Sequence, residues 1–194
     1  MSEIIRRCTP EDARAVAAIY DPIVATTPIS FETDPPGPQE MQRRITAAGD
    51  AYPWLVFDRD GSVAGYVYAS AHRERAAYRW SVDVSAYVDV SARRKGIAGR
   101  LYRVLFDVLS AQGYCSAFAG IALPNDASCS LHERVGFTPV GIYHAVGFKA
   151  GAWHDVGWFE RRLRPAGESP AEPLLLGALG VTPGHIFVPA STNS

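Results

Sequence analysis

Residues 80–99 read WSVDVSAYVDVSARRKGIAG. From Trp80 to Val90 every second residue is apolar, and most of the residues between them are polar. Because strand side chains point alternately to opposite faces, this pattern predicts a β-strand with one polar face. A glycine-rich turn follows at residues 96–99. Apolar residues at helical spacing beyond it predict an amphipathic helix that ends near Gly113.

The turn after this strand has the chemistry of an anion site. Gly96, Ala98 and Gly99 carry little or no side chain, so a large anion can approach their backbone closely. The amides at the start of the next helix carry partial positive charge, and residues 93–95 add three basic side chains. These features predict a pyrophosphate site; the alternative is a plain helix start with a solvated basic patch. The first glycine of the Rossmann fingerprint is missing, and no Gly-Lys-Ser/Thr closes a P-loop.

Composition narrows the class of protein. The chain has 194 residues, 47 % of them hydrophobic and 20 % charged, which suits one domain with a substantial core. A formal net charge of −1 favours neither nucleic acid nor an anionic membrane as partner. The three cysteines form no CxxC pair, so we expect neither a disulfide framework nor a metal site. No signal peptide or long apolar run is evident, and we expect a cytoplasmic protein without a membrane span.

The other elements follow from hydrophobic periodicity and turn residues. They are a strand at 3–7, a helix capped by Thr9 that begins at Pro10, a helix at 38–48, strands at 54–57 and 63–70 around a turn at 58–61, a strand at 114–121, a short helix capped by Asp126 that reaches Val135, and a closing hairpin of strands at 139–148 and 153–162. Pro22 and Pro28 are expected to break the first helix. This order predicts one α+β (mixed α/β) domain with a mainly antiparallel sheet.

The chain changes character near its end. Residues 165–170 resemble a linker, and residues 174–176 and 185–188 form short apolar runs. We therefore assign residues 1–163 to the domain and residues 164–194 to an extension of unknown role. Three alternatives stay open for the extension: it docks on the domain, it packs against a second subunit, or it does not belong to the fold.

Several motifs resemble one known family. Arg93-x-x-Gly96-x-Ala98 matches the Q/R-x-x-G-x-G/A loop of the GNAT acetyltransferases, and residues 125–128 with 131–137 look like their second signature. The resemblance is closest to the phosphinothricin and methionine sulfone/sulfoximine acetyltransferases. The segments similar to that branch are residues 52–56, 77–80, 123–126 and 151–157. The likeness covers about residues 3–163 in the expected order.

The resemblance implies a GNAT-like fold, with a sheet that splays at its centre and helices on both faces. It also implies acetyl-CoA as cosubstrate, no metal, and a homodimer. The backbone of Ala86, Tyr87 and Val88 would pair with the pantetheine arm. The pyrophosphate would lie on the loop of Arg94, Lys95, Gly96, Ile97, Ala98 and Gly99. Asn125 and Ser128 would contact the pantetheine, and Arg134 would reach the nucleotide end.

The same resemblance implies catalytic residues. Acetyl transfer to an amine requires that the ammonium lose a proton, because only the free amine is a nucleophile. Asp83 is our candidate base, at a position where the family usually has Glu; it acts directly, through water, or with a neighbour that shares the role. The alternative is a cross-strand paired Asp. His132 is the candidate proton donor to the leaving thiolate, although it could instead bond within its helix or line the groove.

An amino-acid acceptor also presents an acid group to be bound. Arg73-Glu74-Arg75 resembles the basic anchor of the phosphinothricin branch, and guanidinium groups bind carboxylate, phosphinate or sulfone oxygens well. The other expected acceptor contacts are Phe31, Tyr78, Val84 and Ser85. His154 is read as a structural residue or a gate.

Together these features predict an acetyl-CoA-dependent N-acetyltransferase that acts by direct transfer on the α-amino group of a small amino-acid-like acid. The expected acceptors are phosphinothricin, methionine sulfoximine or methionine sulfone. The alternatives are another amine (a protein N-terminus, a polyamine or an aminoglycoside) or a non-catalytic acyl-CoA sensor.

Overall fold

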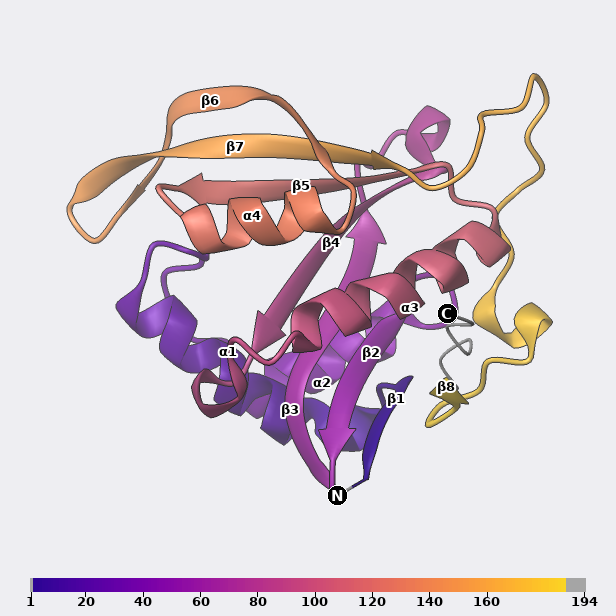
Figure 1. The fold of residues 1–194 in the computed structure, drawn as a ribbon, viewed down its shortest axis with the longest axis horizontal. Coiled ribbons are helices and arrows are strands. Elements are labelled where there is room, and N and C mark those ends of the chain that lie inside the picture. Colours follow the sequence, from indigo (N-terminus) through magenta and orange to yellow (C-terminus); the bar gives the residue numbers. More distant parts are fainter. Residues whose placement is uncertain (1, 188–194) are drawn as a thin grey trace.

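The computed structural model describes residues 2–187, which form one eight-stranded sheet in the order β6-β7-β5-β4-β3-β2-β1-β8 (Figure 1). The strands and helices are β1 (Glu3–Arg7), α1 (Ala13–Thr26), α2 (Gly37–Ala48), β2 (Trp54–Arg59), β3 (Ser62–Ala71), β4 (Ser81–Val88), α3 (Ile97–Gln112), β5 (Ser116–Leu123), α4 (Asp126–Arg134), β6 (Thr138–Lys149), β7 (Ala152–Arg162) and β8 (Ile186–Phe187). Short 3-10 helices lie at Pro10–Asp12, Ala76–Tyr78, Val90–Ala92 and Leu176–Leu179. All neighbouring strands are antiparallel except β4 and β5. The predicted mixed α/β domain is confirmed.

Helices cover both faces of the sheet, with α3 and α4 on one face and α1 and α2 on the other (Figure 1). The apolar side of β4 packs on α3, where Val82 and Val84 join the larger core cluster. The opposite side of β4 faces α1. There Tyr87 makes an edge contact with Tyr20, with ring centroids 4.9 Å apart. The alternating side chains of β4 therefore contribute to two separate cores, and α1 covers part of the polar face of this strand.

The sheet opens between β4 and β5. These strands pair in parallel only over Ser81–Asp83 and Ser116–Phe118. Beyond that point β4 continues along β3, whereas β5 continues along β7 as far as Leu123. The sheet therefore forks immediately after Asp83, as the predicted central splay requires.

Two local predictions were wrong, the break of the first helix at Pro22 and the cap of α4. Pro22 lies inside α1, which continues to Thr26 because Tyr20, Ile23 and Val24 are buried against the sheet. Such tertiary packing offsets the hydrogen bond that proline lacks. The helical segment begins at Pro10, as predicted; residues 10–12 form a 3-10 turn, and the α-helix continues from Ala13.

Thr9 is the N-cap of this turn, as predicted, and the Asp12 carboxylate accepts from the Thr9 backbone N–H at 2.8 Å. The cap of α4 differs from expectation. Before α4, Asn125 Oδ1 accepts from the Ser128 backbone N–H at 3.2 Å, so the cap is Asn125 and not Asp126. A cap needs non-helical backbone, and Asp126 is already helical.

The described part of the extension docks on the domain. β8 adds to the edge of β1, with Arg6 opposite Ile186 and Ile5 opposite Phe187. Leu176 is fully buried in a small cluster with Val108 of α3. Val188, at the end of the second apolar run, lies outside the described residues.

Two features are absent from residues 2–187, a membrane-spanning helix and a cluster of metal ligands. No helix there combines the length and hydropathy needed to cross a bilayer. No group of three or more His, Cys, Asp or Glu side chains in that range could hold a metal ion.

Replacing Leu176 by Ala tests the docking of the extension. We expect a loss of about 2 kcal/mol in the free energy of unfolding, because the change removes fully buried methyl groups. Urea unfolding followed by circular dichroism measures it. Leu175, which is 56 % exposed, provides the matched control. Equal, small effects of Leu175→Ala and Leu176→Ala would show that the extension does not pack.

Candidate functional site

The fork between β4 and β5 is the floor of a cleft that both strands and two helices line. Its walls are Ile29, Val84, Ser85, Ala86, Tyr87, Tyr102, Ala119, Gly120, Ile121, Ala122, Asn125, Ser128 and His132. The cleft therefore brings together the predicted strand positions 84–87 and the predicted residues of α4. Within the described residues, the edge of β4 beyond Asp83 has no strand partner on the β5 side. Such an edge offers backbone donors and acceptors to an extended ligand.

The glycine turn leads from β4 to the start of α3. Gly96 has a φ of 74° and Arg94 a φ of 60°, so the chain bends sharply between them. A side chain at Gly96 would meet nothing within 4 Å, which leaves open space beside the N-terminal amides of α3. These amides lack partners within the helix and favour an anion.

A second cleft of about 600 Å³ adjoins this turn. Gly96 and Gly99 line it together with Arg103, Arg134 and Arg161. Arg134 was predicted here, whereas Arg103 and Arg161 were not. Arg103 follows Gly99 by one helical turn, a spacing that the sequence already contained. The three guanidinium groups suit a ligand with several phosphates.

Asp83 lies at the apex of the fork, beside a histidine that the sequence analysis missed. Its Oδ1 lies 2.7 Å from Nδ1 of His72, which follows the end of β3. The His72 ring stacks on Phe118 of β5, with centroids 4.3 Å apart. Because Ser70 pairs with Asp83, the antiparallel pairing of β3 and β4 could have indicated this diagonal contact.

Burial and charge act on Asp83 in opposite directions. Desolvation raises the pKa of its carboxyl group above the ordinary value, and the hydrogen bond from His72 and the charge of Arg73 partly oppose that rise. A raised pKa makes the carboxylate a stronger base than a solvated one.

His132 is buried, and its partners define its protonation. Nδ1 lies 2.8 Å from the carbonyl oxygen of Ser128, which can only accept, so Nδ1 carries the proton. Nε2 lies 3.0 Å from the Tyr102 hydroxyl, which therefore donates to it. Burial lowers the pKa of His132, although the bond to Ser128 partly opposes this. The ring is thus held neutral, with the Tyr102 hydroxyl as its proton donor.

The predicted acceptor residues divide into two groups. Arg73 and Tyr78 gather around His72: Arg73 Nη1 donates to the His72 carbonyl oxygen at 2.7 Å, and the Tyr78 ring lies 5.8 Å from the imidazole. The Arg73 guanidinium also lies 5.6 Å from the ring centre of Trp158, another residue that sequence reasoning missed. Glu74 and Arg75 are exposed on the same loop, and neither forms an ion pair with any residue from 2 to 187.

Phe31 lies in the second group, against the β6–β7 hairpin. Its ring is so close to Gly147 that a Cβ there would lie 2.1 Å from Cε2 of Phe31. Lys149 Nζ fastens the hairpin by donating to the carbonyl oxygens of Val24 and Ser30, each at 2.7 Å. His154 Nε2 lies 3.0 Å from the Lys149 carbonyl oxygen and donates to it, which supports the structural reading of this histidine.

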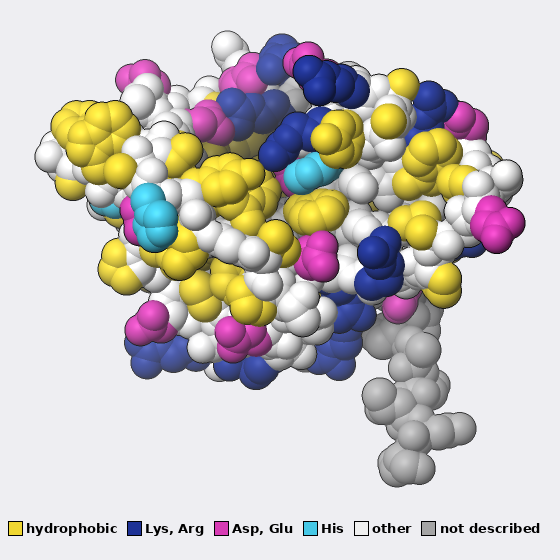
Figure 2. Space-filling view, turned by 90° about the horizontal axis from the view of Figure 1, so that it is seen from above, with side chains coloured by type: hydrophobic (Ala, Val, Ile, Leu, Met, Phe, Trp, Pro, Cys, Tyr) yellow, Lys and Arg dark blue, Asp and Glu magenta, His cyan; other side chains and the backbone are white. Residues whose placement is uncertain are grey.

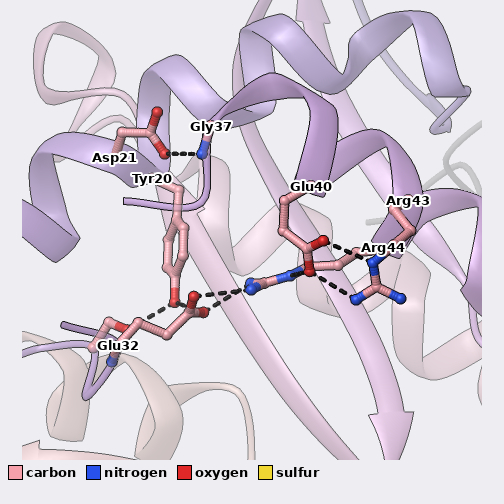
Figure 3. A network of polar contacts seen from close by, with 8 residues as sticks. Tyr20, Asp21, Glu32, Gly37, Glu40, Arg43 and Arg44 are labelled. Atoms are coloured by element: carbon pink, nitrogen blue, oxygen red, sulfur yellow. Dashed lines mark hydrogen bonds and ion pairs between the residues drawn. The ribbon is translucent and has the colours of Figure 1, made fainter. Parts of the chain in front are cut away.

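A polar network fixes the segment that carries Phe31 (Figure 3). The Tyr20 hydroxyl donates to Glu32 Oε1 at 2.8 Å, and Arg44 from α2 binds both oxygens of Glu32 at 2.7 and 2.9 Å. The bonds from Arg44 lower the pKa of Glu32, so this carboxylate stays ionised. The loop between α1 and α2 is therefore anchored to both helices.

Comparison with known proteins gives consistent matches. The acetyltransferase (GNAT) domain family matches residues 5–158. The chain is 40 % identical to a phosphinothricin N-acetyltransferase of Streptomyces viridochromogenes, covering 88 % of this chain and 93 % of that protein. It is 33 % identical to an L-methionine sulfoximine/L-methionine sulfone acetyltransferase of Pseudomonas aeruginosa, covering 88 % and 100 %.

Solved structures agree with these matches. A phosphinothricin acetyltransferase from Sinorhizobium meliloti in complex with AcCoA superposes with a TM-score of 0.82 at 34 % identity, covering 91 % of this chain and 99 % of that one. A ribosomal-protein-alanine N-acetyltransferase from Brucella melitensis superposes with a TM-score of 0.80 at 30 % identity, covering 82 % and 99 %.

The buried neutral state of His132 predicts how stability depends on pH. In the unfolded chain this histidine binds a proton near pH 6.5, but its lowered pKa in the folded protein resists protonation. The free energy of unfolding should therefore fall as the pH drops from about 7.5 to 5.5. Urea unfolding should show a smaller fall for His132→Gln, which is less stable at both pH values. Parallel pH dependence in the two proteins would contradict the assignment.

Proposed function

Since this chain belongs to the GNAT acetyltransferase family, we propose that it transfers the acetyl group of acetyl-CoA directly to the α-amino group of a small amino-acid-like acid. The acceptors we propose are phosphinothricin, methionine sulfoximine or methionine sulfone, the compounds for which its relatives are named. One observation carries the proposal: the pairing of β4 with β5 ends at Asp83, and the free strand edge that follows lines a cleft from Val84 to Tyr87.

The residues of the cleft suit the parts of CoA. The free edge of β4 at Ala86, Tyr87 and Val88 matches the amides of an extended pantetheine arm, with Asn125 and Ser128 opposite. The turn from Arg94 to Gly99 and the amides of α3 suit the pyrophosphate. Arg103 and Arg134 suit the nucleotide end. Acetyl-CoA supplies an activated acyl group, and no metal is needed for this chemistry.

Two groups handle protons in this proposal. A base at Asp83, where desolvation raises the pKa of the carboxyl group, removes the proton from the acceptor ammonium. His132 was predicted to protonate the leaving thiolate. In its neutral form Nε2 has no proton to give, so the proton that this pair offers lies on the Tyr102 hydroxyl.

The acceptor is held, we propose, by the loop between β3 and β4. Arg73 and Arg75 bind its acid group, with Glu74, Tyr78, Val84 and Ser85 around it and Phe31 as a further wall. Two arginines at the anchor disfavour a polyamine or an aminoglycoside, which would need carboxylates. A protein N-terminus is the second candidate, because a relative of 30 % identity is named for such an activity. A non-catalytic acyl-CoA sensor is the outcome if no amine is acetylated.

The proposed setting is the cytoplasm, with a small molecule rather than nucleic acid or a membrane as partner. The net charge of −1 supports a partner other than nucleic acid or an anionic membrane, because it gives no field that would attract a polyanion.

Asp83→Asn tests the proposed base. The change removes the ionisable carboxylate of the base but keeps the shape of the side chain, so turnover should fall about 10²–10⁴-fold. A thiol-release assay with the three proposed acceptors, an alanyl peptide and a polyamine measures this and identifies the acceptor. Acetyl-CoA affinity, measured by calorimetry, should stay unchanged. Full turnover of the variant would remove Asp83 from the mechanism.

We also propose that two chains associate through β6. This strand has an unpaired outer edge among the described strands, and it exposes an unusual number of large apolar side chains. They are Val140, Ile142, Tyr143, Val146 and Phe148, with Trp153 of β7 beside them. Figure 2, which looks down on the side of the molecule where β6 and β7 lie, shows several hydrophobic patches. Apolar surface of this kind is typical of a protein interface.

A double variant with Val146→Asp and Phe148→Asp tests this association. Each carboxylate would have to be desolvated at the interface, so we expect the dimer to dissociate. Light scattering should give twice 21.0 kDa for the wild type and 21.0 kDa for the variant. Leu175→Asp, an equally exposed apolar position on the extension, should remain dimeric. A monomeric wild type would refute the proposal.

A further inference from the structure

We propose that His72 and Asp83 act as one base, in which Nε2 of His72 accepts the proton that the acceptor ammonium loses. This inference rests on the proposed acetyl transfer and deepens it. It assigns a role in the reaction to a histidine that lies outside every motif of the sequence.

The contact between the two side chains defines the tautomer of the imidazole. Asp83 Oδ1 lies 2.7 Å from His72 Nδ1. An ionised carboxylate can only accept, so the proton of the neutral ring lies on Nδ1. The lone pair is then on Nε2, which hydrogen-bonds no residue in the described chain. The pair thus presents a nitrogen base whose other nitrogen is oriented by a carboxylate, as in other catalytic His-Asp pairs.

The ring is held in place on three sides. Phe118 stacks on it at 4.3 Å, Tyr78 makes an edge contact at 5.8 Å, and Trp158 makes another at 6.4 Å. The side chain of His72 is only 11 % exposed, whereas that of Asp83 is 31 % exposed. A surface ion pair would not be packed in this way. A catalytic base, in contrast, needs a fixed orientation toward its substrate.

The pair also overcomes the short reach of Asp83 alone, because Asp is one methylene shorter than the Glu usual in the family. Histidine side chains titrate near neutral pH, where general bases are most efficient. An imidazole that is hydrogen-bonded to Asp83 supplies such a base. Its ring places the basic nitrogen farther from the β4 backbone than the short carboxylate of Asp83 alone.

The charged and titratable groups that face the ring are few. Asp83 faces Nδ1 at 2.7 Å, and Arg73 lies on the same loop as the histidine. The phenol rings of Tyr78 and, beyond Asp83, Tyr68 lie beside the pair. The carboxylate is thus the charged group in direct hydrogen-bond contact with the imidazole ring.

The proton balance is simple. An N–H bond of the acceptor ammonium breaks, an Nε2–H bond forms on His72, and the electron pair stays on the amine nitrogen. The amine then attacks the thioester, and the imidazolium later releases its proton to water. Asp83 remains ionised throughout.

The test is His72→Asn. The amide nitrogen of Asn can replace Nδ1 as donor to Asp83, but the amide does not titrate. We expect kcat to fall about 10²-fold or more, and the acidic limb of the pH profile to be lost between about pH 5 and 8. In His72→Ala, imidazole added to the buffer should restore part of the turnover. Unchanged kcat with the acidic limb intact in His72→Asn would overturn the proposal.

A matched control is available in the same chain. His144 Nδ1 lies 2.9 Å from Asp155 Oδ2 on the exposed side of the β6–β7 hairpin. His144→Asn should leave kcat and its pH profile unchanged. His72→Phe, which keeps the stack on Phe118, should fold and bind acetyl-CoA but lose turnover; full turnover in this variant would also refute the role.

The outcomes separate the two proposals. If the wild type acetylates no amine of the panel, the proposed function fails. If the wild type is active and His72→Asn matches its rate and pH profile, only the role of His72 fails.

Discussion

The parallel pairing of β4 with β5 lasts three residues on each strand, and the functional architecture depends on where it ends. A strand edge inside a sheet normally satisfies its amides and carbonyls with the next strand. Beyond Asp83 the β5 side of β4 has no such partner among the described strands, so its backbone groups are unpaired on that side. The same strand then leads to the glycine turn and to the N-terminal amides of α3. The unpaired edge and the proposed anion site are therefore consecutive along the chain.

Packing on both faces keeps the fork open. On one face α3 buries Val82 and Val84 of β4 together with Ala117 and Ala119 of β5, which holds both strands without closing the gap. On the other face α1 covers Tyr87, and the anchored loop between α1 and α2 carries Phe31 to the β6–β7 hairpin. The two strands diverge because each has a better partner on its outer side, β3 for β4 and β7 for β5.

Burial shifts the pKa values of His132 and Asp83 in opposite directions. His132 is enclosed between Ser128 and Tyr102, two neutral partners, and desolvation lowers its pKa. His72 has a carboxylate as its partner, and desolvation there raises the pKa of Asp83. The first arrangement keeps an imidazole neutral, and the second places a carboxylate in direct contact with one. The two histidines therefore differ in the charge of the residue that they contact.

Local patterns in the sequence determined the strand at 81–88, the turn at 96–99, α3 and the closing hairpin, because period-two alternation, small residues and helical spacing lie in consecutive residues. The resemblance of motifs indicated the family. The tertiary structure alone decided that α1 continues through Pro22, that residues 186–187 extend the sheet beside β1, and that His72 meets Asp83. It also determined the point at which β4 and β5 part. These features depend on contacts between segments far apart in the chain, whose energies no local pattern records.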